Sequence, residues 1–331
     1  MKPFEDLTTR GKARRLRPLA MSALERYDLD IKRIELVRND LNGIFRVRTT
    51  SGMSYLLRIC LPDHHGLATI RSEIFWLEAL AREADIPVPE PIPTRDGEMV
   101  VTARAEGVPE SRRCVLFSWL PGKDLHRTAT TGEFEALGRL MARLHDHTDR
   151  WQPPDGFRVR TLNQVYPFGD PAGLLGEDHR ENFDPDTAAL IGEIERRIRD
   201  ELDRMYGSGA PQVIHADLHW GNVKIYRGTL QPLDFEDLAL AFPVQDIAIS
   251  LFYSLGDERF PALRRAFRDG YSSVRAWPEE FDGQLNLLIV HRGIDLFNYL
   301  LTSRFPGRER WFPSFVGNIH GRYQELLGDD D

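Results

Sequence analysis

Residues 213–237 read VIHADLHWGNVKIYRGTLQPLDFED and hold an ordered set of polar residues within a short β-like stretch. Asp217 lies five residues before Asn222, and an Arg-Gly turn signal at 227–228 separates both from Asp234. A hairpin turned at this pair would fold Asp234 back beside the loop that carries the other two side chains. The spacing therefore predicts that one carboxamide and two carboxylates converge at a single site.

These residue types suit phosphoryl transfer. That reaction needs a carboxylate to orient and deprotonate the attacking hydroxyl, and oxygen ligands for the Mg²⁺ that neutralises the phosphates. Because Mg²⁺ prefers hard oxygen ligands and keeps several waters, one carboxamide and one carboxylate are sufficient protein ligands. Asp217 therefore fits the role of catalytic base, while Asn222 and Asp234 fit the role of metal ligands.

The order His-x-Asp-x-x-x-x-Asn at 215–222, with a downstream Asp-Phe pair at 234–235, resembles the phosphotransferase family. This family includes aminoglycoside phosphotransferases, choline kinases and bacterial homoserine kinases, which are small relatives of eukaryotic-type protein kinases. The chain also resembles the bacterial stress-response Ser/Thr kinase of the family, and the likeness extends from about Ile34 to the C-terminal helices. The resemblance implies ATP-dependent transfer of a phosphoryl group to a hydroxyl acceptor, with Mg²⁺ as the metal.

The resemblance also implies an α+β, bilobal protein-kinase-like fold, with a small antiparallel β N-terminal lobe and a larger, mainly helical C-terminal lobe. We expect the nucleotide lobe at 1–117, a hinge at 118–122 and the catalytic and acceptor-binding lobe at 123–331, with ATP between the lobes. The chain's own patterns agree, because β-like runs dominate before the hinge and helical runs dominate after it.

Hydrophobic periodicity predicts the individual elements. Apolar residues with period two, separated by turn signals, predict an antiparallel three-stranded meander over 34–61, after a helix at 12–27. The four prolines of 86–95 predict an extended connector. Further strands are predicted at 98–103 and 114–119, and further helices at 68–84, 132–147, 185–206, 243–254, 258–269, 279–302 and 312–327.

Supporting roles near the motif come from the resemblance. The segment FPVQDIA is similar to the family's Asp-Leu-Ala segment, whose Asp, here Asp246, buttresses the catalytic loop. His215 is expected to order this loop rather than to act as an acid or base. Ala216 replaces the Arg of the protein-kinase His-Arg-Asp, so activation-loop phosphorylation has no obvious partner. Glu236 stands where protein kinases have Gly, and it is expected to be either an indirect metal partner or a surface charge.

A lone Arg58 lies among apolar residues on the third predicted strand, where it needs an anion. The resemblance places the family's phosphate-binding lysine here, and a guanidinium also holds phosphate. The family's matching Glu is Glu73, with Glu78 as a rival. No Gly-rich motif precedes this strand. The turn at 39–43 occupies its place, and the N–H groups around Asn42 and Gly43 could contact phosphate, although an ordinary hairpin turn needs no such role.

The run VLFSWLPG at 115–122 resembles the family's hinge. Adenine is then expected to be read by the Ser118 carbonyl and the Leu120 N–H, with Phe117 lining its pocket. Since main-chain atoms would read the base, the sequence does not decide between ATP and GTP. Taken alone, this run predicts only a buried strand that ends in a turn.

Composition limits the other possibilities. The 331 residues carry a formal net charge of −8, which argues against a general nucleic-acid binder. The two cysteines, Cys60 and Cys114, lie in apolar runs and are expected to be buried thiols. The N-terminus is too charged for a signal peptide, and the apolar stretch 285–301 holds three charged or titratable groups that a membrane span would not carry. We expect a cytoplasmic protein with no membrane partner.

Two rival functions remain open on sequence grounds. His215, Asp217 and His219 alternate along the chain like the zinc ligands of a metallohydrolase on a strand, but no second His/Cys cluster with matching spacing accompanies them. A pseudokinase that binds nucleotide without turnover is the other rival, although the base, both metal ligands and a phosphate-facing cation are all present.

The acceptor is left open. A small molecule, such as an amino alcohol, an aminoglycoside or a homoserine-like compound, is favoured over a protein Ser/Thr acceptor. Acidic residues near the expected cleft would attract a cationic acceptor, but each is more simply a solvated surface charge. These residues are Asp170, Glu177, Asp178 and Asp295.

Overall fold

The computed structural model describes the whole chain except Met1, Glu5, Asp40, Asp63, Arg127, 303–310 and 329–331. Asp40, part of the turn expected to contact phosphate, therefore lies outside the described residues. The chain divides into two compact units. Unit 1 comprises Met1–Lys123, Gln152–Arg158 and Lys224–Glu236, and unit 2 comprises Asp124–Trp151, Val159–Val223 and Asp237–Asp331. The predicted lobe boundaries stay a prediction.

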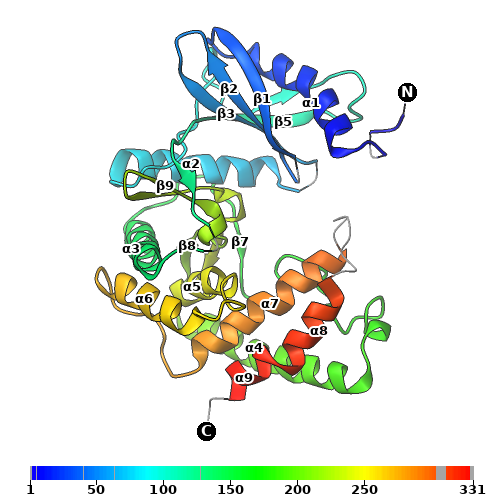
Figure 1. Cartoon of the computed structure of the whole chain (residues 1–331), viewed down its shortest axis with the longest axis vertical. Helices are drawn as coiled ribbons and strands as arrows, with labels where there is room; N and C mark the ends of the chain where they lie inside the picture. Colours follow the sequence, from blue (N-terminus) through cyan, green and yellow to red (C-terminus); the bar gives the residue numbers. More distant parts are fainter. Residues whose placement is uncertain are drawn as a thin grey trace. The chain divides into compact units, whose positions relative to one another are not determined.

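Unit 1 is built on an antiparallel sheet with the strand order β1-β2-β3-β5-β4 (Figure 1). Its first three strands form the predicted meander, in which Asn39 pairs with Gly43 across the first turn. Helix α1 packs its apolar face on the sheet, so Leu19 and Leu24 share one core with Phe45. The elements are α1 (Thr9–Leu24), β1 (Ile31–Asn39), β2 (Gly43–Thr49), β3 (Ser54–Ile59), α2 (Leu67–Glu83), β4 (Val101–Ala103) and β5 (Arg112–Ser118).

Helix α1 begins and ends three residues earlier than its apolar spacing predicted. The Thr8 side chain caps it by accepting a hydrogen bond from Gly11 N at 3.2 Å. Tyr27, which continued the helical spacing, lies beyond the helix end but is still buried in the core. Burial at Tyr27 therefore reflects packing of the connection to β1, not continuation of the helix.

The predicted hairpin after the Asp217 motif is present. Strands β9 (Val223–Tyr226) and β10 (Thr229–Pro232) pair in a small sheet of order β10-β9-β6, with β6 at Lys123–Asp124. Arg227 and Gly228 both have positive φ, 50° and 82°. A two-residue loop with both residues left-handed matches the right-handed twist of the strands it joins. The Arg-Gly signal thus predicted the position of the turn, and the structure adds its left-handed geometry.

Unit 2 is mainly helical and holds one short sheet of order β7-β11-β8. Its strands are β7 (Arg160–Thr161), β8 (Gln212–Ile214) and β11 (Ala239–Ala241). Its helices are α3 (Thr131–Thr148), α4 (Pro185–Ser208), α5 (Pro243–Phe252), α6 (Phe260–Ser272), α7 (Gln284–Thr302), α8 (Phe312–His320) and α9 (Arg322–Gly328). With the antiparallel sheet of unit 1, these helices confirm the predicted α+β class.

One predicted helix is wrong as a continuous element. The expected helix at 312–327 is divided into α8 and α9 because Gly321, at φ −116° and ψ −101°, leaves helical geometry. Glycine has a low helix propensity, so a break there costs little. Helix α7 also starts later than expected, at Gln284.

Two glycines bring α3 and α6 into backbone contact. A Cβ on Gly138 would collide with the carbonyl oxygen of Phe267, and one on Gly270 would collide with the carbonyl oxygen of Glu135. Only glycine permits this approach. The close packing aligns α3 and α6 side by side, which sets the positions of two side chains used in the site below.

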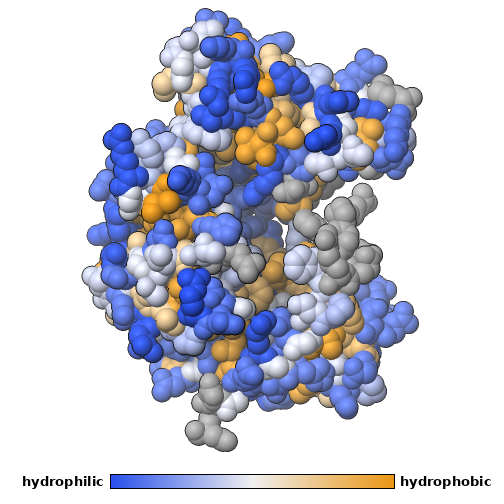
Figure 2. Space-filling view, viewed as in Figure 1, coloured by the Kyte–Doolittle hydropathy of each residue, from blue (hydrophilic) through white to orange (hydrophobic). Residues whose placement is uncertain are grey.

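On the face seen in Figure 2, both units present mostly hydrophilic side chains, with hydrophobic ones in separate patches. Both cysteines are buried free thiols, as expected. Among the described residues, no helix combines the length and the apolar character that crossing a membrane requires.

Candidate active site

The loop that carries Asp217 is anchored in unit 2 by Asp246. His215 N donates to Asp246 Oδ2 at 3.2 Å, and Ala216 N donates to Oδ1 at 2.9 Å. Asp246 lies in the first turn of α5, where the helix dipole stabilises a negative charge. Ala216 adopts a left-handed φ of 62°, which is unfavourable for a residue with a Cβ. The two hydrogen bonds to Asp246 offset that strain and fix the turn before Asp217.

Asp246 is itself held by a buried chain of polar groups. His145 Nε2 lies 3.0 Å from Asp246 Oδ2, and His145 Nδ1 lies 2.9 Å from the Tyr271 hydroxyl. His145 comes from α3 and Tyr271 from α6, the two helices joined through glycines. The packing of these helices therefore fixes the Asp246 carboxylate, and Asp246 in turn fixes the loop that carries Asp217.

Asp217 and Asn222 lie together, as their spacing predicted. Asn222 Nδ2 donates to Asp217 Oδ2 at 2.7 Å and to the Asp217 carbonyl oxygen at 3.0 Å. His215 Nδ1 accepts from Asp217 N at 3.3 Å, so His215 contacts the loop backbone. Because the amide nitrogen of Asn222 binds Asp217, its carboxamide oxygen is the atom that suits a cation.

Two residues at this site were missed by sequence reasoning. Arg292 Nη2 and the Tyr253 hydroxyl each donate to Asp217 Oδ1 at 3.0 Å. Burial raises the pKa of Tyr253, so its hydroxyl keeps its proton at neutral pH. The available signal was a charged residue, Arg292, inside the apolar stretch 285–301. From the sequence, Arg292 was used only as evidence against a membrane span.

Asp295, expected to be a solvated surface charge, is buried. It is 2% exposed, and Oδ1 accepts from Phe168 N at 3.4 Å. Burial raises its pKa to about 7, and Arg292 opposes that rise. Glu177 and Asp178 are exposed, in line with the expectation for a surface charge.

Among the described residues, His215, Asp217 and His219 do not form the ligand set that the zinc alternative requires. His219 Nδ1 accepts from Gly221 N at 3.0 Å, and its ring stacks on Tyr253. Burial lowers the pKa of His219 to about 3, so the imidazole is neutral at pH 7. Within the part of the chain that the structure describes, His215, Asp217 and His219 are not among the groups whose ligand atoms could reach one metal ion.

In unit 1, Arg58 pairs with Glu73 and not with the rival Glu78. Arg58 Nη1 donates to Glu73 Oε1 at 2.8 Å, and Nη2 donates to Oε2, so the pair is bidentate and buried. Burial acts to lower the pKa of Arg58, but Glu73 raises it well above its usual value overall. The strand β3 and the helix α2 are joined by this charge pair.

Two roles were expected for Glu236, an indirect metal partner or a surface charge, and the structure does not place it at the surface. Its side chain is 13% exposed and lies 3.5 Å from Arg58 Nη1. Both carboxylate oxygens accept from Asn42 Nδ2, at 2.9 and 2.8 Å. Asn42 Oδ1 in turn accepts from Leu61 N at 2.9 Å. Asn42 thus ties the turn before Gly43 to the end of β3 and to the Asp-Phe-Glu segment, while a phosphate contact of this turn stays a prediction.

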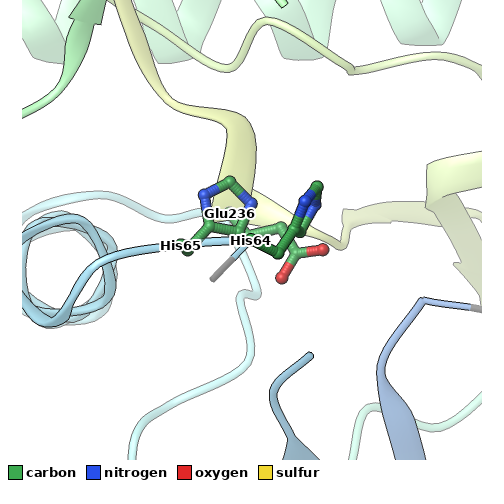
Figure 3. A group of neighbouring side chains, drawn as sticks. All are labelled: His64, His65 and Glu236. Atoms are coloured by element: carbon green, nitrogen blue, oxygen red, sulfur yellow. The ribbon is translucent and has the colours of Figure 1, made fainter. Parts of the chain in front are cut away.

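Glu236 also lies beside His64 and His65, shown in Figure 3. The ligand atoms of the three residues lie within 4.8 Å of one another. Imidazole nitrogens and a carboxylate are donor types that suit a transition metal. However, Glu236 already binds Asn42 and faces the Arg58 cation, and a metal would have to share that carboxylate. The observed contacts favour Glu236 as an anionic partner of Asn42 and Arg58.

Asp234 belongs to unit 1 and has a left-handed φ of 63°, a conformation that Asp tolerates better than most residues. Its side chain is 29% exposed, and Oδ2 lies 3.3 Å from Arg38 Nη2. The next residue, Phe235, is buried against Trp76 of α2, with ring centroids 5.4 Å apart. The buried aromatic anchors the segment and leaves the carboxylate partly accessible.

The predicted hinge residues lie at the end of β5. Ser118 N donates to the Glu90 carbonyl at 2.7 Å, and Ser118 Oγ accepts from Glu90 N at 2.9 Å. Phe117 is buried, with the Arg58 guanidinium 5.2 Å from its ring centroid. The Leu120 carbonyl accepts from Lys224 Nζ at 3.4 Å. None of these contacts tests the expected reading of adenine, which stays a prediction.

The chain is similar to known phosphotransferases. The sequence model of the phosphotransferase enzyme family matches residues 34–281. Amicoumacin kinase of Bacillus subtilis (strain 168) is 24% identical over 272 residues, which are 78% of this chain and 71% of that protein.

Solved structures of kinases share the fold. A microcompartment-associated aminopropanol kinase superposes with a TM-score of 0.79 and 26% identity, over 95% of this chain and 98% of that one. Amicoumacin kinase hAmiN, in complex with AMP-PNP, Ca²⁺ and Ami, has a TM-score of 0.72 and 18% identity, over 97% and 100%. An aminoglycoside 2′-phosphotransferase-IIIa mutant, in a GDP complex, has a TM-score of 0.61 and 13% identity, over 94% and 97%.

Proposed function

Because this chain belongs to the phosphotransferase enzyme family and is a kinase, we propose that it transfers the γ-phosphoryl group of ATP to a hydroxyl group of a small molecule. The observation that carries this proposal is the pair of Asp217 and Asn222 on a loop that Asp246 fixes. This pair supplies the carboxylate and the carboxamide that phosphoryl transfer uses, five residues apart.

Asp217 acts on the acceptor in this proposal. Its carboxylate orients the acceptor hydroxyl and accepts its proton as the oxygen attacks the γ-phosphorus. The bond between the γ-phosphorus and the β,γ-bridging oxygen breaks, and ADP leaves with that electron pair. The products are the phosphorylated acceptor, ADP and a proton held at first by Asp217. At 18% exposure, Asp217 is accessible to an acceptor from solvent.

Asn222 and Asp234 are the proposed protein ligands of Mg²⁺. Their donor atoms fit, because Asn222 uses its amide nitrogen on Asp217 and so offers its oxygen, and Asp234 is a partly exposed carboxylate. When bound, Mg²⁺ neutralises charge on the phosphates. Glu236 supports this segment indirectly through Asn42 and Arg58.

Arg58 is the proposed phosphate-binding cation, and Glu73 orients it. A guanidinium has five N–H donors, and the bidentate pair with Glu73 uses two of them. Nη1 also lies 3.5 Å from Glu236, so the donors that remain for phosphate are those that face neither carboxylate, while the ion pair holds the group in place. In this proposal the main chain of Ser118 and Leu120 reads the adenine, and Phe117 lines its pocket.

An amino alcohol is the acceptor class that we favour. Among the relatives described above, the one with the highest TM-score and identity is named an aminopropanol kinase. The formal net charge of −8 also favours a cationic acceptor over an anionic one. A protein acceptor is the alternative that the experiment below includes.

The experiment is an acceptor screen of the purified full-length chain with Mg-ATP. The panel holds aminopropanol and other amino alcohols, an aminoglycoside, homoserine and a generic protein substrate, with phosphorylated product and ADP both measured. We expect product from an amino alcohol, equimolar with ADP, and at most about one hundredth of that rate from the Asp217→Ala variant. Product from the protein alone would replace the small-molecule proposal, and GTP is tested in place of ATP on the best acceptor.

A further inference from the structure

Arg292 is a charged residue of α7 that the Asp217 motif does not include. Its side chain is 8% exposed, and its Nη2 donates to Asp217 Oδ1 at 3.0 Å and to the Tyr253 hydroxyl at 2.8 Å. Its Nη1 lies 3.7 Å from Asp295 Oδ2. Burying a guanidinium costs free energy unless carboxylates compensate its charge. Asp217 supplies most of that compensation and Asp295 adds to it when ionised, so the three side chains form one network.

Tyr253 completes a triangle with Arg292 and Asp217. Its hydroxyl donates to Asp217 Oδ1 and accepts from Arg292. Its ring stacks on His219, with centroids 3.7 Å apart and an interplanar angle of 16°, which fixes the position of the hydroxyl. Oδ1 thus receives two hydrogen bonds, and Oδ2 receives one from Asn222. The carboxylate cannot rotate without breaking at least one of them.

We propose that Arg292 is a positioning residue for phosphoryl transfer and that Tyr253 shares this role. The inference rests on the proposed function of Asp217. Together Arg292 and Tyr253 fix the direction in which the carboxylate meets the acceptor hydroxyl. Direction matters because a misplacement of about 1 Å at a reacting group can lower a rate roughly 10²-fold. An ion pair with a purely structural role would affect folding and leave the rate of the folded enzyme unchanged.

The test compares steady-state kinetics and thermal unfolding of the full chain and its variants. Arg292→Lys keeps the charge but loses the planar fork that reaches two oxygens at once. Tyr253→Phe removes only the hydroxyl. We expect kcat to fall roughly 10-fold in each of these and about 100-fold in Arg292→Met, with both KM values within about threefold of wild type. In the Arg292→Lys/Tyr253→Phe double variant, the loss should be smaller than the product of the single losses, because both groups hold the same oxygen.

Arg264→Lys is the matched control. Arg264 also contacts α7, through Asn286 Oδ1 at 2.6 Å, and lies 3.8 Å from Glu279, but it makes no described contact with Asp217. This control should keep the wild-type kcat. If Arg292→Met does not fold, the other two variants still decide the matter.

Wild-type kcat in folded Arg292→Lys and Tyr253→Phe enzymes would overturn the inference while leaving the proposed function intact. An equal fall of kcat in the Arg264→Lys control would also overturn it, because the effect would then not be specific to the Asp217 contact. A wild-type chain that phosphorylates none of the acceptors would instead contradict the proposed function, and the inference would fail with it.

Discussion

Arg58 and Glu73 form a bidentate ion pair in the interior of unit 1, and both side chains are almost fully buried. Removing one partner leaves the other as an uncompensated buried charge. Glu236 lies 3.5 Å from Arg58, so it would compensate part of the Arg58 charge if Glu73 were lost, but it would not replace the bidentate pair. Substituting one partner is therefore expected to destabilise unit 1 as well as to disturb the proposed nucleotide site.

Glu73→Gln should lower the free energy of unfolding by about 2–4 kcal/mol, because Arg58 then keeps its buried charge without its bidentate partner. The same variant should weaken ATP binding, since Arg58 loses its orientation. Urea unfolding and nucleotide titration measure the two effects. Glu78→Gln, on the same helix, is the matched control and should change stability by less than about 0.5 kcal/mol. Equal effects of the two substitutions would show that the pair is unimportant.

Asp246→Asn should disorder the loop that carries Asp217. Asn keeps one acceptor oxygen for one of the two donors, His215 N and Ala216 N, but its NH₂ group would then face the other N–H donor. We expect a loss of about 2–4 kcal/mol in unfolding free energy and a fall of kcat in the molecules that remain folded. Asp203→Asn, on an exposed position of α4, serves as the control. A stable, fully active Asp246→Asn enzyme would contradict the buttress role.

Asp234→Ala should weaken metal-dependent nucleotide binding, because a proposed Mg²⁺ ligand is removed. The measurement is ATP affinity as a function of Mg²⁺ concentration. We expect roughly a tenfold or larger increase in the Mg²⁺ concentration required, by analogy with the loss of other metal contacts. Removal of Mg²⁺ with a chelator should have the same effect on the wild type. Unchanged metal dependence in the variant would argue against Asp234 as a ligand.

His291 should make the protein less stable in acid. Burial lowers the pKa of His291 to about 4, below its ordinary value of 6.5, and its Nε2 lies 2.9 Å from the Val165 carbonyl oxygen. Between these two pH values the unfolded chain binds the proton and the folded chain does not, so the contribution of His291 to folding stability falls as pH is lowered from about 6.5 to 4.

Each proton taken up on unfolding contributes a slope of up to about 1.4 kcal/mol per pH unit. Asp295 opposes this slope, because its raised pKa of about 7 makes the folded state bind an extra proton in the same range. His291→Gln removes the histidine contribution alone. Urea unfolding between pH 7 and 4.5 should therefore show a shallower acid loss in the variant, and an unchanged slope would mean that His291 does not titrate in this way.

The sequence predicted best those parts of the site that are close together along the chain. Asp217 and Asn222 share one loop, and the Arg-Gly pair at 227–228 determines the hairpin that follows, so spacing and turn chemistry are sufficient. The Arg58–Glu73 pair was expected because the family resemblance aligned a strand with the next helix.

Contacts between distant segments could not be read in the same way. Tyr253 and Arg292 reach Asp217 from 36 and 75 residues away. Periodicity predicts that α5 and α7 are helices, but it does not say which side chain at the edge of an apolar face points toward a loop elsewhere. For the same reason Asp295 was expected at the surface. The tertiary structure instead buries it beside Arg292.

Turnover by Asp217→Ala tests the central assignment most directly. The Asp217 carboxylate is proposed to accept the acceptor's proton, while the nucleotide is bound by other residues. We therefore expect kcat to fall by at least about 10²–10⁴-fold while the dissociation constant for Mg-ATP stays within about threefold of wild type. Wild-type turnover in the folded variant would contradict the assignment.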